Sequence, residues 1–174
     1  MRTALTMVIL VTLAGCGRPA PPPAPAPAIR LTSSAIAPGG RINPRQSAHG
    51  DNLSPPLNWT AVPGAETYAI VMEDPDAPGR TPFVHWLAWN IPAGVTSLAE
   101  GEDAGVQGGN DNGQLGYFGP APPSGTHHYR LKIFALDTTL PLGRGEKKDA
   151  LDRAMDVHVL ARGELDGTFA APSN

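Results

Sequence analysis

Four side chains in this sequence can donate, accept or transfer protons. Asp74 and Asp76 lie in the stretch MEDPDAPG, where two carboxylates and two prolines occupy a space in which a plain turn needs only one of each. His85 follows this stretch closely, and His127 comes after a second proline-rich loop. Imidazoles donate N–H groups to phosphoryl oxygens and gain charge beside such an anion, while a carboxylate can orient a ring or receive an ammonium group. These residue types indicate a polar binding site.

Mostly β-strands are expected to position these side chains. Four short runs have the apolar or alternating pattern of strands: residues 68–73, 84–91, 128–136 and 158–165. Only residues 146–155 (EKKDALDRAM) have helical spacing, with Lys147 and Lys148 on the expected solvent face. The pattern predicts a mainly β domain with one short helix near the C-terminus.

The two prolines restrict the backbone around the first carboxylates. Pro75 biases Asp74 towards an extended conformation, and Pro78 does the same to the residue before it. One interpretation is a pair of plain turns that ends a strand. The other is a rigid rim that holds Asp74, because a hairpin to the next strand would bring His85 towards it. We expect the rigid rim.

The composition excludes some classes of protein. The 174 residues are 41% hydrophobic, enough for one domain with a sizeable core. The formal net charge of −3 differs from the basic footprint of nucleic-acid-binding proteins, so no nucleic-acid partner is expected. Twenty glycines and 20 prolines favour a loop-rich β fold over a helical one.

The N-terminus has the pattern of an export signal. Residues 4–13 (ALTMVILVTL) form an apolar segment too short to span a bilayer as a mature helix. Leu-Ala-Gly-Cys follows and resembles the lipobox of bacterial lipoproteins, which implies cleavage before Cys16 and lipidation of its thiol. An ordinary signal peptide with an incidental cysteine is the alternative. Gly17, rather than Asp, after the cysteine suggests the outer membrane, facing the periplasm, in a Gram-negative host.

Three segments follow from this interpretation. Residues 1–15 are the expected signal peptide, and residues 16–28 are a lipidated cysteine with a linker rich in proline and alanine. Such a linker cannot form a helix and is expected to be an extended spacer. Residues 29–174 form the folded domain. Within it, residues 101–119 contain seven glycines and are expected to be either a disordered insert or a functional loop.

Six spaced blocks resemble the phosphatidylethanolamine-binding protein family, in its bacterial branch described as Raf-kinase-inhibitor-like. The blocks, in chain order, are residues 50–59 (GDNLSPPLNW), 73–78 (EDPDAP) with 85–86 (HW), 110–111 (ND) with 116–117 (GY), 119–129 (GPAPPSGTHHY), 158–161 (HVLA) and 163–165 (GEL). Together they cover nearly all of residues 31–169. The order and number of the blocks carry the resemblance, because a single DPDAP would be weak evidence.

The resemblance implies a β-sandwich domain with a small pocket for phosphate-like anions. It implies these ligand-binding residues: Asp74, His85, His127, Pro122, Pro123 and Gly119. The residues expected to support the pocket are Asp76, Pro78, Trp86 and Tyr129. This chain departs from the family in having His128 where Arg is usual and a bulky Phe118 in the loop.

The resemblance implies non-catalytic binding of a small phosphate-like anion or a phospholipid head group, without a cofactor. The alternative is a regulator of an envelope protein, similar to a protease inhibitor, acting through the surface around the pocket. A metal-dependent enzyme is a third interpretation, since Asp74, Asp76, His85 and His127 are possible metal ligands. No H-E-x-x-H helix accompanies them, and they lie on different loops, so we expect no metal and no enzyme activity.

Overall fold

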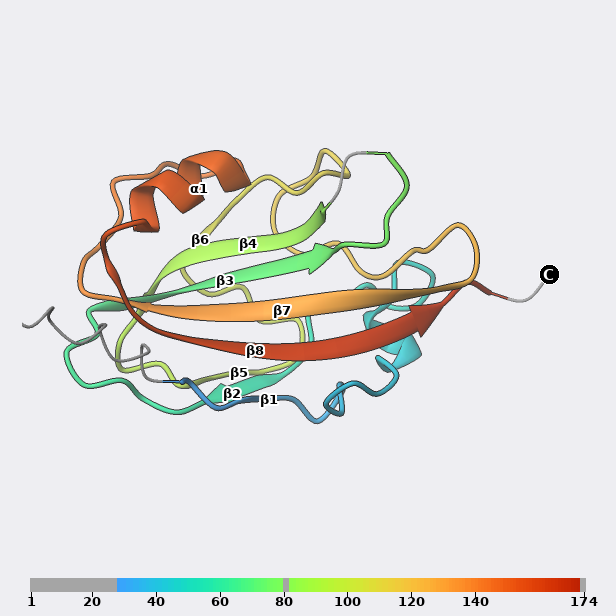
Figure 1. Cartoon of the computed structure of the whole chain (residues 1–174), viewed down its shortest axis with the longest axis horizontal. Coiled ribbons are helices and arrows are strands. Elements are labelled where there is room, and N and C mark those ends of the chain that lie inside the picture. The colour runs from blue at the N-terminus through green and yellow to red at the C-terminus, as the bar shows by residue number, and fades with distance from the viewer. Residues whose placement is uncertain (1–27, 80–81, 173–174) are drawn as a thin grey trace, which may run out of the picture.

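The computed structural model of the chain describes residues 28–79 and 82–172 (Figure 1). The expected signal peptide, Cys16 and the linker as far as residue 27 lie outside the described residues. Ile29 is buried, and its N–H donates to the carbonyl of Arg162, so the chain is already packed on the domain at this position. Among the described residues, no helix has the length and apolar character needed to cross a membrane.

Most of the domain is a five-stranded antiparallel sheet with the order β6-β4-β3-β7-β8. Its strands are β3 (Thr67–Asp74), β4 (Phe83–Pro92), β6 (Val106–Gln107), β7 (Thr126–Leu136) and β8 (Val159–Ala170). Every residue of the central strand β3 is buried, as its continuous apolar pattern predicts. In β7, Tyr129, Leu131 and Ile133 lie on the buried face, which confirms the predicted alternation.

A smaller sheet covers one face of the large one, and a helix covers part of the other face (Figure 1). The small sheet has the order β1-β2-β5, with β1 (Leu31–Thr32), β2 (Leu57–Trp59) and β5 (Ser97–Leu98). The main apolar core lies between the two sheets. A 3-10 helix, η1 (Pro44–Gln46), interrupts the loop between β1 and β2.

The single α-helix, α1 (Lys148–Met155), packs on the outer face of the large sheet. Its buried residues, Leu151 and Met155, contact a second apolar cluster that includes Val71, Leu87 and Trp89. The helix exists where the 3.6-residue period predicts it but begins two residues later than residue 146, because Lys147 has an extended backbone and serves as the N-cap. The mainly β sandwich with one short helix is therefore confirmed.

An irregularity in the sheet lies at the first predicted histidine. Met72 pairs with Trp86 and the next residue, Glu73, pairs with Val84, so β4 has one extra residue, His85, between them. Such a β-bulge redirects the side chain that it inserts. His85 is thereby placed beside the end of β3, where Asp74 is the last residue.

Candidate functional site

A pocket of about 290 Å³ lies at the end of the large sheet where β3 ends and β4 and β7 begin. We call it the Asp74 pocket. It is lined by Asp74, Ala77, Pro78, Phe83, His85, Phe118, Ala121, Pro122, Pro123 and His127. Two proline-rich segments therefore form the walls, and one carboxylate with two imidazoles supplies the polar groups. The lining surface is otherwise apolar.

Asp74 is 3% exposed, and both of its carboxylate oxygens accept hydrogen bonds from the protein. Oδ2 lies 2.8 Å from Nδ1 of His127, and Oδ1 accepts the backbone N–H of Asp76 at 2.8 Å. The second bond closes an Asx turn, in which an Asp side chain binds the backbone two residues further on. The prolines and this turn together fix Asp74 at the rim, which explains why the stretch DPD is more than the end of a strand.

His127 is 8% exposed and is oriented by Asp74. Because a carboxylate only accepts hydrogen bonds, Nδ1 of His127 must carry the proton that it shares with Oδ2. Nε2 is then the ring nitrogen left for a ligand. In the neutral ring this atom is an acceptor, and in the charged ring it is a donor.

His85 is fixed by a carbonyl in the same way. Its Nδ1 donates to the carbonyl of Phe118 at 2.7 Å, and the N–H of Phe118 donates back to the His85 carbonyl at 2.9 Å. The Phe118 ring stacks on the imidazole at 5.7 Å between centroids, and Phe83 lies at 4.9 Å. Burial lowers the pKa of His85, although its bond to the Phe118 carbonyl and the nearby Asp74 charge oppose this. The ring is therefore neutral near pH 7, and its Nε2 is an acceptor.

Tyr129 supports the pocket from below. Tyr129 is 1% exposed. Its ring and the His85 imidazole pack edge to face, with 5.2 Å between the ring centroids. Among the described residues its hydroxyl has no hydrogen-bond partner. Burial, reinforced by the charge of Asp74, raises the pKa of Tyr129, so the hydroxyl keeps its proton as a donor.

Asp76 ties the proline-rich turn to β7. Its Oδ2 accepts the backbone N–H of His128 at 2.8 Å and the Nδ1–H of the same residue at 2.7 Å. These hydrogen bonds lower the pKa of Asp76. His128, which stands where the resemblance leads one to expect Arg, is exposed and points away from the pocket. The substitution therefore changes the contact with Asp76 and not the lining of the pocket.

Comparisons with known proteins establish what kind of domain carries this pocket. The family model described as phosphatidylethanolamine-binding protein matches residues 32–170. The chain belongs to that family. A curated relative from Methanothermobacter thermautotrophicus, named UPF0098 protein, is 43% identical over 81% of this chain and 98% of its own length. A UPF0098 protein from Pyrococcus horikoshii is 36% identical over 95% of this chain and 89% of its own.

Two solved structures of the phosphatidylethanolamine-binding protein family share the fold. A homologue from Chlamydia trachomatis has a TM-score of 0.79 and 36% identity, covering 83% of this chain and 99% of that one. YbcL from Escherichia coli, described as a new member of the mammalian phosphatidylethanolamine-binding protein family, has a TM-score of 0.78 and 30% identity, covering 84% of this chain and 100% of that one.

Five of the six ligand-binding residues that the family resemblance predicts line one pocket: Asp74, His85, His127, Pro122 and Pro123. Gly119, the sixth, does not line it. It lies against η1, where an added Cβ would come within 2.1 Å of the Gln46 carbonyl oxygen, and its N–H donates to Asn52. Gly119 therefore lets the Phe118 loop pack closely on the loop before β2.

Among the expected supporting residues of this family member, Pro78 lines the pocket itself, and Trp86 lies elsewhere. Trp86 is fully buried in the core between the sheets, and its Nε1 donates to Oε1 of Gln107 at 2.9 Å. The sequence reasoning missed Phe83 and Phe118, the two rings beside His85. The only indication of these rings in the sequence was that Phe118 is bulkier than usual at its position in the loop.

Metal ligation was the rival chemistry for the same residues. Within residues 28–79 and 82–172, no group of three or more His, Cys, Asp or Glu side chains has the arrangement needed to hold a metal ion.

Proposed function

We propose that this protein binds a small phosphate-like anion, or the phosphate of a phospholipid head group, in the Asp74 pocket without chemical conversion. The observation that supports this proposal is that two imidazoles in the pocket are oriented in the same way. His85 and His127 each have Nδ1 bound to a protein oxygen and Nε2 left over, in one small pocket with apolar walls. Such a pair suits a ligand with several oxygens around one centre.

Asp74 has a positioning role in this proposal. Both of its oxygens already accept N–H groups, from His127 and from the backbone of Asp76, so the carboxylate is less suited to receive the ammonium end of a head group. By accepting Nδ1–H of His127, it fixes the orientation of the ring and leaves Nε2 for the ligand.

Anion binding in this pocket requires a proton. Two neutral imidazoles offer acceptors at Nε2, and a dianion offers only acceptors as well. Either one Nε2 takes up a proton or the ligand donates its own P–O–H to the ring. Phosphate binding should therefore strengthen as pH falls towards the pKa of His85.

The rim of the pocket favours a small ligand over a protein partner. In the described part of the chain, the exposed large hydrophobic side chains are Leu115 and Val157, and neither lines the Asp74 pocket. A regulator that docks an envelope protein would gain from an apolar surface there. The inhibitor-like function therefore remains the less supported alternative.

The proposed setting is the cell envelope. The resemblance of residues 13–16 to a lipobox supports lipidation of Cys16 and a membrane anchor, with the outer membrane expected in a Gram-negative host. The assignment to the bacterial Raf-kinase-inhibitor-like branch rests on the sequence blocks. Residues 17–27 would then separate the anchored cysteine from the domain.

Calorimetric titration of the full chain with inorganic phosphate and with O-phosphorylethanolamine tests the binding function. We expect saturable binding that is lost in His127→Ala, while His158→Ala, which removes an imidazole far along the chain, retains it. A zinc titration serves as the metal control. Zinc binding without phosphate binding would replace the anion site with a metal centre, and phosphate binding that survives His127→Ala would place the site elsewhere.

A further inference from the structure

The outer face of the large sheet has a second pocket directly behind the first. It has a volume of about 380 Å³ and is lined by Glu73, Pro75, Pro82, Arg130, Lys132 and Lys148. We call it the Glu73 pocket. Because successive residues of a strand point to opposite faces, Glu73 opens here while its neighbour Asp74 opens into the Asp74 pocket. Its volume lies within the range of small-molecule sites.

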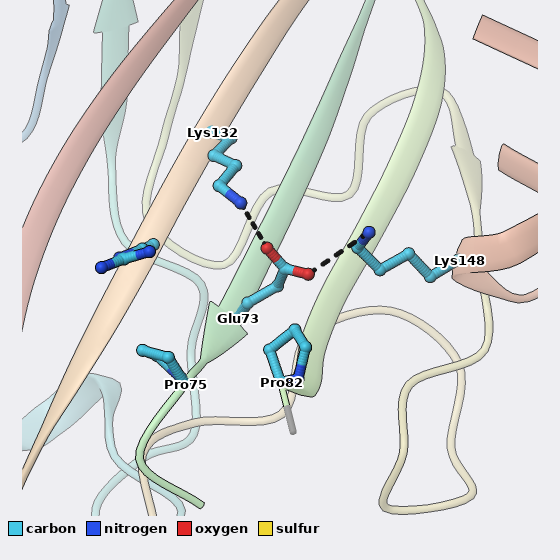
Figure 2. Close-up of a pocket in the computed structure, with 6 residues that line it drawn as sticks. Glu73, Pro75, Pro82, Lys132 and Lys148 are labelled. Carbon is cyan, nitrogen blue, oxygen red and sulfur yellow. Dashed lines mark hydrogen bonds and ion pairs between the residues drawn. The ribbon is translucent and has the colours of Figure 1, made fainter. Parts of the chain in front are cut away.

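Glu73 is an almost fully buried carboxylate held between two lysines. Its Oε2 lies 2.5 Å from Nζ of Lys132 on β7, and its Oε1 lies 3.4 Å from Nζ of Lys148 at the start of α1. Figure 2 shows the two lysines reaching Glu73 from opposite sides, with Pro75 and Pro82 beside it. Lys148 also lies 2.5 Å from Asp152, so its charge is divided between two carboxylates.

Arg130 adds a third cation to the same lining. It lies two residues before Lys132 on β7, so both side chains are on the outer face of the sheet. Within the described residues, no carboxylate forms an ion pair with Arg130, although Asp166 is its neighbour across the strands. The lining therefore has three cations and one anion, an excess of positive charge in a concave site.

Hydrogen-bond donors remain available on these cations. Lys132 uses one of its three N–H groups on Glu73, and the guanidinium of Arg130 has no hydrogen-bond partner among the described residues. Lys148 is shared between Glu73 and Asp152, an exposed residue that does not line the pocket.

We infer that the Glu73 pocket is a second binding site for a phosphoryl group, independent of the Asp74 pocket. Glu73 holds the two lysines apart, and Arg130 supplies the planar pair of N–H donors that matches two oxygens of one phosphate. A single carboxylate ligand would balance less of the excess charge than a phosphate dianion. The source of the phosphoryl group is either a free phosphate ester or the head group of an anionic phospholipid.

Site-resolved NMR of the full chain tests this inference. The probes are inorganic phosphate for the first source and dihexanoyl phosphatidylglycerol, a soluble short-chain lipid, for the second. We expect saturable shifts of the backbone N–H signals of Lys132 and Lys148 with at least one probe, at a dissociation constant of about 1 mM or lower. The probe that binds identifies the source.

Arg130→Met is the decisive variant because it removes a cation that holds no partner in the described structure. It should weaken binding at these signals about tenfold, as expected for a lost charge-assisted hydrogen bond. Arg153→Met removes one charge from the exposed side of α1 and should leave the affinity unchanged. His127→Ala should also leave it unchanged, which separates this pocket from the Asp74 pocket.

Two results would overturn the inference. One is the absence of saturable shifts at Lys132 and Lys148 with both probes. The other is an equal affinity in Arg130→Met and the unaltered protein. In either case the Lys132–Glu73–Lys148 cluster only fastens α1 to the sheet.

Discussion

Glu73 and Asp74 are consecutive residues of β3, and each contributes a buried carboxylate to the lining of a pocket, but the two pockets are built differently. The Asp74 carboxylate is held by an imidazole and a backbone N–H, between proline and aromatic walls. The Glu73 carboxylate is held by the ends of two long lysine side chains that are more than a quarter exposed. The residues that hold Asp74 are buried, whereas the lysines that hold Glu73 are partly in contact with water, so we expect the first site to be the more rigid one.

Because the two pockets are built differently, we expect them to respond differently to pH and to salt. We expect anion binding in the Asp74 pocket to be limited by protonation, because each of its imidazoles has one nitrogen occupied. In the Glu73 pocket the charges are permanent, so we expect binding to be limited by screening and by competing acids. The proposals therefore give adjacent positions of one strand a pH-dependent site and a salt-dependent site.

The largest expected difference between the pockets is in stability. Asp74→Ala leaves the buried His127 Nδ1–H and the Asp76 N–H without their acceptor and should lower the free energy of unfolding by about 3 kcal/mol. Glu73→Ala frees two lysines that can reach water and should cost about 1 kcal/mol. Urea unfolding of both variants measures the contrast, and equal costs would contradict the proposed difference in rigidity.

The rigid walls of the Asp74 pocket can be tested through the glycine behind them. Gly119→Ala would bring a Cβ to 2.1 Å from the Gln46 carbonyl oxygen and should cost about 2 kcal/mol while weakening phosphate binding. Gly143→Ala is the matched control, since nothing lies within 4 Å of its added Cβ, and should change stability by less than about 0.5 kcal/mol. Thermal unfolding with calorimetric titration would show whether the two variants differ.

The pH dependence of sulfate binding should also differ between the two pockets. Sulfate carries no proton near neutral pH, so its binding to the Asp74 pocket must protonate an imidazole. Because burial lowers the pKa of His85, the free ring is neutral above its ordinary value of 6.5, and sulfate affinity should rise by up to about tenfold per unit as pH falls. At the Glu73 pocket, sulfate affinity should stay constant over the same range. A titration series with NMR detection separates the two, and parallel pH profiles would be the contrary result.

The pKa of His85 also has a consequence for stability without any ligand. Since the folded-state pKa lies below the unfolded value, the unfolded chain binds the proton first, and stability is complete above pH 6.5 and declines as pH falls through the folded-state pKa. His85→Gln should flatten this decline. Urea unfolding at several pH values gives the slope, and an unchanged slope would show that His85 does not titrate differently on folding.

The smallest expected effect concerns the acid that competes for Lys148. Asp152 lies 2.5 Å from Lys148 Nζ, four residues further along α1, and such exposed pairs contribute about 0.5 kcal/mol or less. Asp152→Asn should release Lys148 and raise phosphate affinity at the Glu73 pocket about twofold. Asp156→Asn removes an equal charge from the end of α1 and should not. A matching rise in both variants would indicate only a general charge effect.

Much of the fold follows from local sequence. The apolar run of β3, the alternation of β7 and the period of α1 predict these elements within two residues, because burial on two faces, one face or a stripe leaves distinct patterns. The prolines around Asp74 indicated a restricted backbone, and the structure has an Asx turn there. The segment with seven glycines proved to contain β6 and to deliver Phe118 to the pocket.

The parts that sequence could not provide depend on register and on distant contacts. Because of the β-bulge, His85 and Trp86 both face the core between the sheets, but only His85 lines the pocket, and Trp86 is fully buried in that core. Lys148, expected on the solvent face of its helix, pairs with Glu73, 75 positions earlier. The sequence around either residue does not indicate this contact, because the two residues are far apart along the chain.

The most direct test of the central claim is an NMR titration of the histidine ring nitrogens with inorganic phosphate at constant pH. All five histidines can be observed together, so His49, His128 and His158 act as internal controls. We expect that Nε2 of His127, of His85 or of both changes from a lone-pair nitrogen to a hydrogen-bonded one, while Nδ1 of each keeps its proton. Phosphate binding that leaves both of these rings unchanged would contradict an anion site in the Asp74 pocket.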